Sequence, residues 1–181
     1  YENIIAVPFR NRNVHLEYFI KKYGSLLQEH LPNSKVVVVE QNTGKLFNRG
    51  TLLNVAFKEY ENKTKHFFTH DVDINPQKSV EEHYIKEVTD SDVLGIYTSQ
   101  CDTLGGIIKM KNSTLQNTNK HYTKFKTLNN EKKLKAIMSS GLNNLKYTVL
   151  ERKMIHDMVE LIKGKFEVIN AEMYKSIVYY L

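Results

Sequence analysis

Two aspartates, separated by a single residue, follow an apolar stretch of the sequence. The segment reads HFFTHDVDINP, and the pair is Asp71 and Asp73. In a strand, residues two apart project from the same face, so an extended chain would aim both carboxylates the same way. Two like charges at this spacing favour a cation beside them, and oxygen ligands suit Mg²⁺ or Mn²⁺. A solvated acidic turn on the surface is the competing interpretation.

Arginines occur at two other places that look like strand ends. Arg10 and Arg12 lie in PFRNR, and Arg49 follows Phe47 in LFNRG. Guanidinium groups bind phosphate oxygens through paired hydrogen bonds, although surface arginines in loops are the simpler alternative. A phosphate, a metal ion and a flat base would together use three arginines, an aromatic ring and two carboxylates.

The order of the predicted elements explains why these side chains should meet. The predicted strands span residues 3–9, 35–41, 65–74 and 92–100, and the predicted helices span 14–31 and 51–60. Alternating strands and helices predict an α/β fold with an open, mostly parallel sheet flanked by helices. Ligands bind beyond the carboxyl ends of the strands in such sheets, which is where the arginines and aspartates stand.

The second half of the chain is less regular. Its predicted elements are a short helix within 131–145 that ends near Gly141, a strand at 146–152, a helix at 154–165 and a strand at 166–173. Neither a repeat nor a long linker is evident, so residues 1–181 are predicted to form a single catalytic domain.

Composition narrows the function classes. The 181 residues are 41% hydrophobic and 25% charged, as is ordinary for a globular protein. The net charge of +6 permits an anionic partner, but the basic residues are spread out, so a solvated basic face is favoured and no nucleic-acid partner is expected. Cys101 is the only cysteine, which excludes an intrachain disulfide and a cysteine zinc cluster. Five of the seven histidines (His66, His70, His83, His121 and His156) have no recognisable metal-binding spacing and are expected to be ordinary core or surface residues.

Five segments occur in an order that points to a family. They are VPFRNRNVHLEYF, KLFNRGTLLNVAFKEY, FFTHDVDINP, LGGIIKMKNSTLQ and SSGLNNLKYTVL. Together they closely resemble the catalytic domain of the β-1,4-galactosyltransferase family. The resemblance implies a nucleotide-sugar-binding fold of the GT-A type and an inverting, Mn²⁺-dependent enzyme, with Mg²⁺ as the alternative ion. Such an enzyme moves galactose or N-acetylgalactosamine from a UDP-sugar to a glycan or glycoconjugate acceptor in β linkage.

The resemblance also assigns roles to single residues. It implies that Asp71 contacts the nucleotide sugar, that Asp73 ligates the metal, and that His121 is the remaining candidate for a further metal ligand. The implied UDP-sugar site comprises Pro8, Phe9, Arg10, Arg12, Phe47, Arg49, Asp71, Val72, Thr103, Gly105 and Gly106. The family often has a large aromatic residue at the position of Thr103, so the smaller threonine would leave space for a bulkier donor such as UDP-GalNAc.

The chain departs from the family where the acceptor segment should lie. Asn119 is followed directly by Lys120, whereas the family continues into a W-G-W-G-G-E-D-D segment that supplies acceptor contacts and the catalytic base. The chain contains no tryptophan. An unseen segment at this junction is favoured over a truly shortened chain, and the catalytic residues stay unknown. The alternative function is an inactive domain of the same fold that binds UDP-sugars or glycans.

The cellular location is left open by the sequence. Animal members of the family are usually anchored in the Golgi membrane, which implies the Golgi lumen. Neither an anchor nor a cysteine pair is visible here, so a cytoplasmic location also stays open. Because the chain begins at Tyr1 rather than Met, we expect a fragment whose targeting segment would lie outside it.

Overall fold

The computed structural model describes residues 1–42, 47–74, 81–90, 93–97, 106–113 and 147–166. The helices are α1 (Asn13–His30), α2 (Arg49–Tyr60) and α3 (Glu81–Ile85). The strands are β1 (Asn3–Phe9), β2 (Ser34–Gln41), β3 (His66–His70), β4 (Val93–Tyr97), β5 (Ile107–Lys111), β6 (Tyr147–His156) and β7 (Val159–Phe166). Within these residues, no helix combines the length and apolar character needed to cross a membrane.

The strands form one sheet of mixed direction. Its order is β4-β5-β3-β1-β2-β7-β6. The central neighbours β3, β1, β2 and β7 pair in parallel, whereas the pairs at both edges are antiparallel. The predicted α/β fold is therefore confirmed, with parallel pairing confined to the middle of the sheet.

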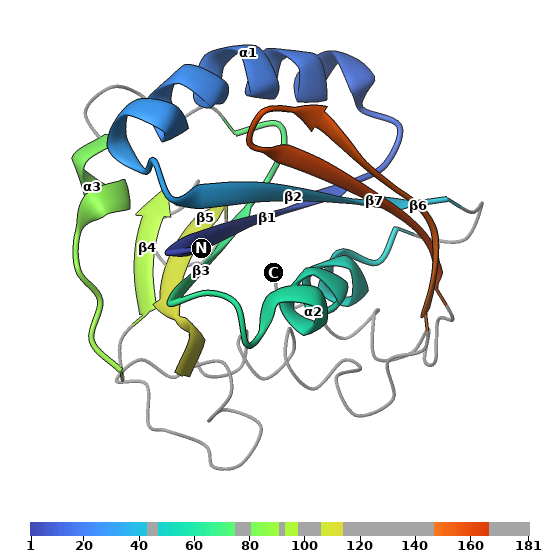
Figure 1. Ribbon diagram of the computed structural model, residues 1–181. Helices are drawn as coiled ribbons and strands as arrows, with labels where there is room; N and C mark the ends of the chain where they lie inside the picture. Colours follow the sequence, from blue (N-terminus) through green and yellow to red (C-terminus); the bar gives the residue numbers. More distant parts are fainter. Residues whose placement is uncertain (43–46, 75–80, 91–92, 98–105, 114–146, 167–181) are drawn as a thin grey trace.

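The two long helices cover opposite faces of this sheet (Figure 1). Strand β1 shows how the sequence produces this layering, because its side chains alternate between two core clusters. Ile4 and Ala6 pack with α2, while Ile5 and Val7 pack with α1, and all four are fully buried. Burial on both faces explains why the central strands are nearly continuous apolar runs.

The predicted helix over 154–165 is wrong. Those residues form the end of β6, a turn and most of β7, which lies parallel to β2. In β7, Ile162 packs on the α2 face of the sheet, and Val159 and Leu161 pack on the α1 face. The apolar residues Met154, Ile155, Met158, Val159 and Ile162 recur at helical spacing, so the pattern of this segment could not be distinguished from that of a helix. The strand predicted at 146–152 is confirmed and extends to His156; the helix at 131–145 lies outside the described residues, as does the strand at 166–173 beyond Phe166.

The strand predicted to run through both aspartates ends before them. Strand β3 stops at His70, and Asp71 begins a turn in which the Ile74 N–H donates to the Asp71 carbonyl at 3.2 Å. The partner strand β5 begins at Ile107, and Gly106 just before it has a φ of 76°. The strand-alternation argument for Asp71 and Asp73 is therefore wrong, because a turn carries both carboxylates.

Candidate functional site

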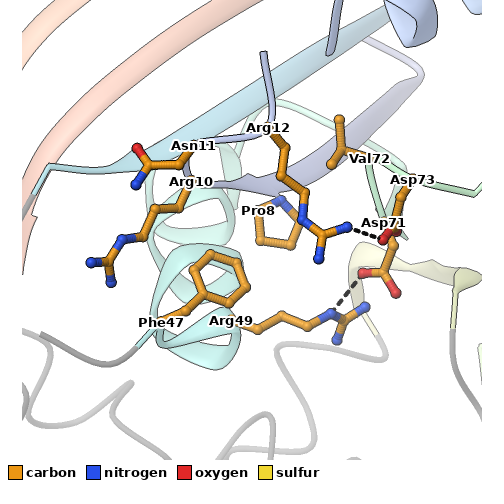
Figure 2. A pocket seen from close by; sticks show the side chains of 9 residues that line it. All are labelled: Pro8, Arg10, Asn11, Arg12, Phe47, Arg49, Asp71, Val72 and Asp73. Carbon is orange, nitrogen blue, oxygen red and sulfur yellow. Dashed lines mark hydrogen bonds and ion pairs between the residues drawn. The ribbon is translucent and has the colours of Figure 1, made fainter. Parts of the chain in front are cut away.

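An open pocket of about 420 Å³ lies where β1 and β3 end and α2 begins (Figure 2). Its lining consists of Pro8, Arg10, Asn11, Arg12, Phe47, Arg49, Asp71, Val72 and Asp73. All of these except Asn11 belong to the site predicted from the sequence. Segments more than 60 residues apart in the chain thus meet at the sheet edge where a ligand was expected.

Two arginines of the pocket are paired with its two aspartates. Arg49 Nε donates to Asp71 Oδ1 at 2.8 Å, and Arg12 forms an ion pair with Asp73 (Figure 2). The Arg12 and Asp73 side chains are 52% and 42% exposed. Exposed ion pairs contribute little to stability, at most about 1 kcal/mol, so an incoming ligand could replace this one at low cost.

Arg49 has a donor that its protein neighbours leave unused. Its Nη2 is buried and has no hydrogen-bond partner among the described residues. A buried donor without an acceptor costs about 1–3 kcal/mol, and an oxygen atom of a bound ligand would remove that cost. Phosphate oxygens and the carbonyl oxygens of a pyrimidine base both meet this requirement.

The position of Arg49 follows from the way α2 begins. Asn48 caps the helix, because its side chain accepts a hydrogen bond from the Thr51 N–H at 3.0 Å. The Asn48 N–H in turn donates to the Gln41 side chain at the end of β2, at 2.9 Å. Arg49 is thus the first residue of a helix whose amino end faces the pocket, where the helix dipole favours an anion.

Asn11 also lines the pocket but is not among the residues predicted from the sequence. It has a φ of 51°, in the left-handed region that few residues other than glycine adopt, although asparagine tolerates it. The reversal of the backbone at Asn11 separates the two flanking arginines. In Figure 2, Arg12 extends toward Asp73, and Arg10 lies on the other side of Phe47. An asparagine between two arginines just after a strand was the available signal for this turn.

Substitutions at Asn11 should separate backbone strain from side-chain chemistry. We expect Asn11→Gly to keep the free energy of unfolding within about 0.5 kcal/mol of the original protein. Asn11→Val should lower it by about 1–2 kcal/mol or more, because a β-branched residue is strained at this φ. Urea denaturation measures both values. Equal losses in the two variants would show that the asparagine side chain, and not the backbone, matters.

Of the remaining residues of the predicted site, those that the structure describes are not in the lining of this pocket. Phe9 is 3% exposed in the core beneath α1 and does not line the pocket. Gly106 lies beside the acidic turn, because its carbonyl accepts the Asp71 N–H at 3.0 Å. Thr103, Gly105 and His121 lie outside the described residues. In the part of the chain that is described, no cluster of three or more His, Cys, Asp or Glu side chains could hold a metal ion.

His70 stands directly before the acidic turn and is confirmed as a core histidine. It is 1% exposed, and burial lowers the pKa of its imidazole from 6.5 to about 4. Because removing the charged form from water is unfavourable, the ring is neutral at physiological pH.

Sequence comparisons place the amino-terminal half of the chain. Residues 1–85 match the family model described as the N-terminal region of glycosyl transferase group 7. Human (Homo sapiens) β-1,4-galactosyltransferase 4 is 40% identical over 75 residues, which are 40% of this chain and 22% of that protein. Bos taurus β-1,4-galactosyltransferase 1 is 42% identical over 55 residues, which are 30% of this chain and 14% of that protein. The amino-terminal half of this chain is thus similar in sequence to β-1,4-galactosyltransferases.

Two solved structures of a β-1,4-galactosyltransferase share the fold of this chain. A Drosophila β-1,4-galactosyltransferase 7 mutant, crystallised with manganese, UDP-Gal and xylobiose, superposes with a TM-score of 0.73 at 16% identity. The superposition covers 92% of this chain and 95% of that one. The catalytic domain of the Drosophila enzyme with xylobiose gives a TM-score of 0.71, also at 16% identity, and covers 92% of this chain and 94% of that one. The predicted GT-A fold is therefore confirmed, while the sequence matches span only about a fifth or less of the curated relatives.

Proposed function

We propose that this chain is a glycosyltransferase domain that transfers galactose or N-acetylgalactosamine from a UDP-sugar to a glycan or glycoconjugate acceptor in β linkage. The observation that carries the proposal is the pocket itself. It brings Arg10, Arg12 and Arg49 together with Asp71 and Asp73 at the carboxyl edge of parallel strands. The similarity to β-1,4-galactosyltransferases in sequence and fold supports the same reaction class.

The charges of the pocket suit a nucleotide diphosphate. Three guanidinium groups line it against two carboxylates, so the described lining carries a net positive charge. Phe47 offers an aromatic face on which a flat base can stack. The unused Nη2 of Arg49 offers a hydrogen bond to a phosphate or base oxygen.

The ion pair between Arg12 and Asp73 in the free protein suggests that donor binding and metal binding are coupled. A diphosphate that bonds Arg12 would separate it from Asp73, because the anion competes with the carboxylate for the same guanidinium. The released Asp73 carboxylate would then be available to a cation. Since this pair is about half exposed, its rupture requires little free energy.

The chemistry of these two carboxylates fits a divalent metal. Asp71 and Asp73 are hard oxygen donors on one short turn, and ions such as Mn²⁺ or Mg²⁺ commonly take one or two carboxylates and complete their shell with substrate phosphates and water. When bound, the metal would stabilise the charge that develops on the departing diphosphate. Asp73 is the proposed ligand here, and His121 stays a predicted one.

Calorimetric titration of UDP tests donor binding. We expect binding in the presence of Mn²⁺ that weakens about tenfold or more when EDTA replaces the metal, because the ion links the carboxylates to the diphosphate. A titration with Mg²⁺ in place of Mn²⁺ identifies the preferred ion. Failure of the protein to bind UDP with either metal would contradict the proposal.

A second candidate, a binding domain without turnover, is favoured by one feature of the sequence. Asn119 runs directly into Lys120, and the chain lacks the tryptophan-containing segment from which the family draws its catalytic base. Release of UDP from UDP-Gal and UDP-GalNAc, with and without a sugar acceptor, distinguishes the two functions. Acceptor-dependent release supports a transferase, whereas Mn²⁺-dependent UDP binding without release supports the binding domain.

A further inference from the structure

The histidine that ends β3 is enclosed by aromatic rings from two helices. Phe19 and Tyr23 of α1 pack against the His70 ring in T-shaped arrangements, with centroid distances of 5.0 and 5.2 Å. Tyr84 of α3 stacks on it at 6.3 Å. All three aromatic residues are at most 1% exposed. Elements on one side of the sheet thus hold this imidazole in a single orientation.

Both ring nitrogens of His70 have hydrogen-bond partners. Nδ1 lies 2.9 Å from the carbonyl oxygen of Asp71, and Nε2 lies 3.0 Å from the hydroxyl of Tyr84. A carbonyl oxygen can only accept, so Nδ1 must carry the proton. Nε2 is then the acceptor, and Tyr84 donates to it. The two contacts therefore select one tautomer of the neutral ring.

The atom that His70 bonds is the one that closes the acidic turn. The Asp71 carbonyl accepts the Nδ1–H of His70 and also the Ile74 N–H, at 3.2 Å. On its other side, the Asp71 N–H donates to the Gly106 carbonyl at 3.0 Å. The peptide groups on both sides of the Asp71 side chain are thus held, and Asp73 lies inside the closed turn.

We propose that His70 is a positioning residue for the donor pocket: its Nδ1–H fixes the Asp71 carbonyl, and the turn fixed in this way directs the Asp71 and Asp73 carboxylates into the pocket. Simple packing does not require a donor at this site, since a phenylalanine would fill an aromatic cage equally well. The effect on ligand affinity rests on the proposed function, whereas the hold on the turn is a property of the free protein.

Two isosteric substitutions separate this role from packing. The side-chain amide of His70→Asn places an N–H close to the position of Nδ1, so it keeps the donor to Asp71. The longer amide of His70→Gln places its N–H near Nε2, where it reaches Tyr84 and not the Asp71 carbonyl. Both variants lose the aromatic ring, so both should lose stability. Phe57→Leu, which changes a buried residue of α2 on the opposite face of the sheet, is the control for a general loss of stability.

Amide hydrogen exchange in the free protein measures directly how firmly the turn is held. We expect the Ile74 and Asp71 amides of His70→Asn to exchange within about threefold of the original protein after correction for global stability. Those of His70→Gln should exchange about tenfold faster or more, because one hydrogen bond to the turn is lost. Phe57→Leu should leave them unchanged. Equal exchange in the asparagine and glutamine variants would overturn the proposal.

The affinity of the variants for UDP in the presence of Mn²⁺ is the second test of the proposal. The dissociation constant of His70→Asn should stay within about threefold of the original value, and that of His70→Gln should rise about tenfold. If the original protein binds no UDP, the proposed function fails, while the exchange contrast still decides the role of His70. Nitrogen NMR of the unmodified protein needs no variant to fold: a proton on Nδ1 supports the proposal, and a proton on Nε2 overturns it.

Discussion

Replacing Asp73 with alanine is expected to abolish Mn²⁺-dependent binding of UDP. Asp73 forms an ion pair with Arg12 in the free protein. In the proposed site, the diphosphate displaces Asp73 from Arg12, and the Asp73 carboxylate then binds the metal. Loss of a group that merely supports a metal ligand weakens a site 10–100-fold as a rule, so loss of the ligand itself should raise the dissociation constant by at least about 100-fold. Calorimetric titration of UDP with and without Mn²⁺ measures this directly.

The fold of the Asp73→Ala variant should be nearly unaffected. The lost ion pair is about half exposed, and such pairs contribute at most about 1 kcal/mol. Asp90→Ala is a matched control, because it removes another exposed carboxylate, paired with Lys111 at 3.3 Å near the opposite end of β3. It should leave UDP binding unchanged. Mn²⁺-dependent binding that survives in Asp73→Ala would rule out the assigned metal ligand.

Acidification is expected to destabilise the folded protein through His70 by about 3 kcal/mol. Burial lowers the pKa of this imidazole to about 4 in the folded chain, whereas the unfolded chain takes up the proton near the usual value of 6.5. The difference between these two pKa values corresponds to about 3 kcal/mol of the free energy of unfolding. Because the folded pKa is the lower one, the stabilisation is complete above pH 6.5 and is lost as the pH falls from 6.5 toward 4.

Urea denaturation at several pH values between 7 and 4.5 measures this loss, and His70→Asn isolates it. The variant has no imidazole at this position, so its stability should fall less steeply with acidification. His66 acts in the same direction in both proteins, because burial also lowers its pKa. The difference between the two pH profiles therefore belongs to His70. Parallel profiles would show that this histidine does not bind a proton on unfolding as its burial requires.

Much of the site could be predicted because its residues follow elements with strong local patterns. The strand of residues 3–9, the helices at 14–31 and 51–60 and the strand of 35–41 are all found within two residues of their predicted ends. Parallel strands bring their carboxyl ends to one edge, so the arginines and Asp71 could be expected together without any knowledge of distances. The five motifs in order then gave the resemblance to β-1,4-galactosyltransferases and, through it, the GT-A fold.

Tertiary structure alone decided the features that depend on partners distant in the chain. The segment 154–165 is a hairpin rather than a helix because β2 offers it a parallel edge, whereas its apolar residues recur at a spacing that also fits a helix. Strand β3 ends at His70 because the neighbouring strand starts at Ile107, so a turn and not a strand presents Asp71 and Asp73. The left-handed backbone of Asn11 and the hydrogen bonds of His70 likewise depend on the surrounding fold. The sequence by itself therefore determined which side chains form the pocket, and only the packing of distant segments determined how they are held.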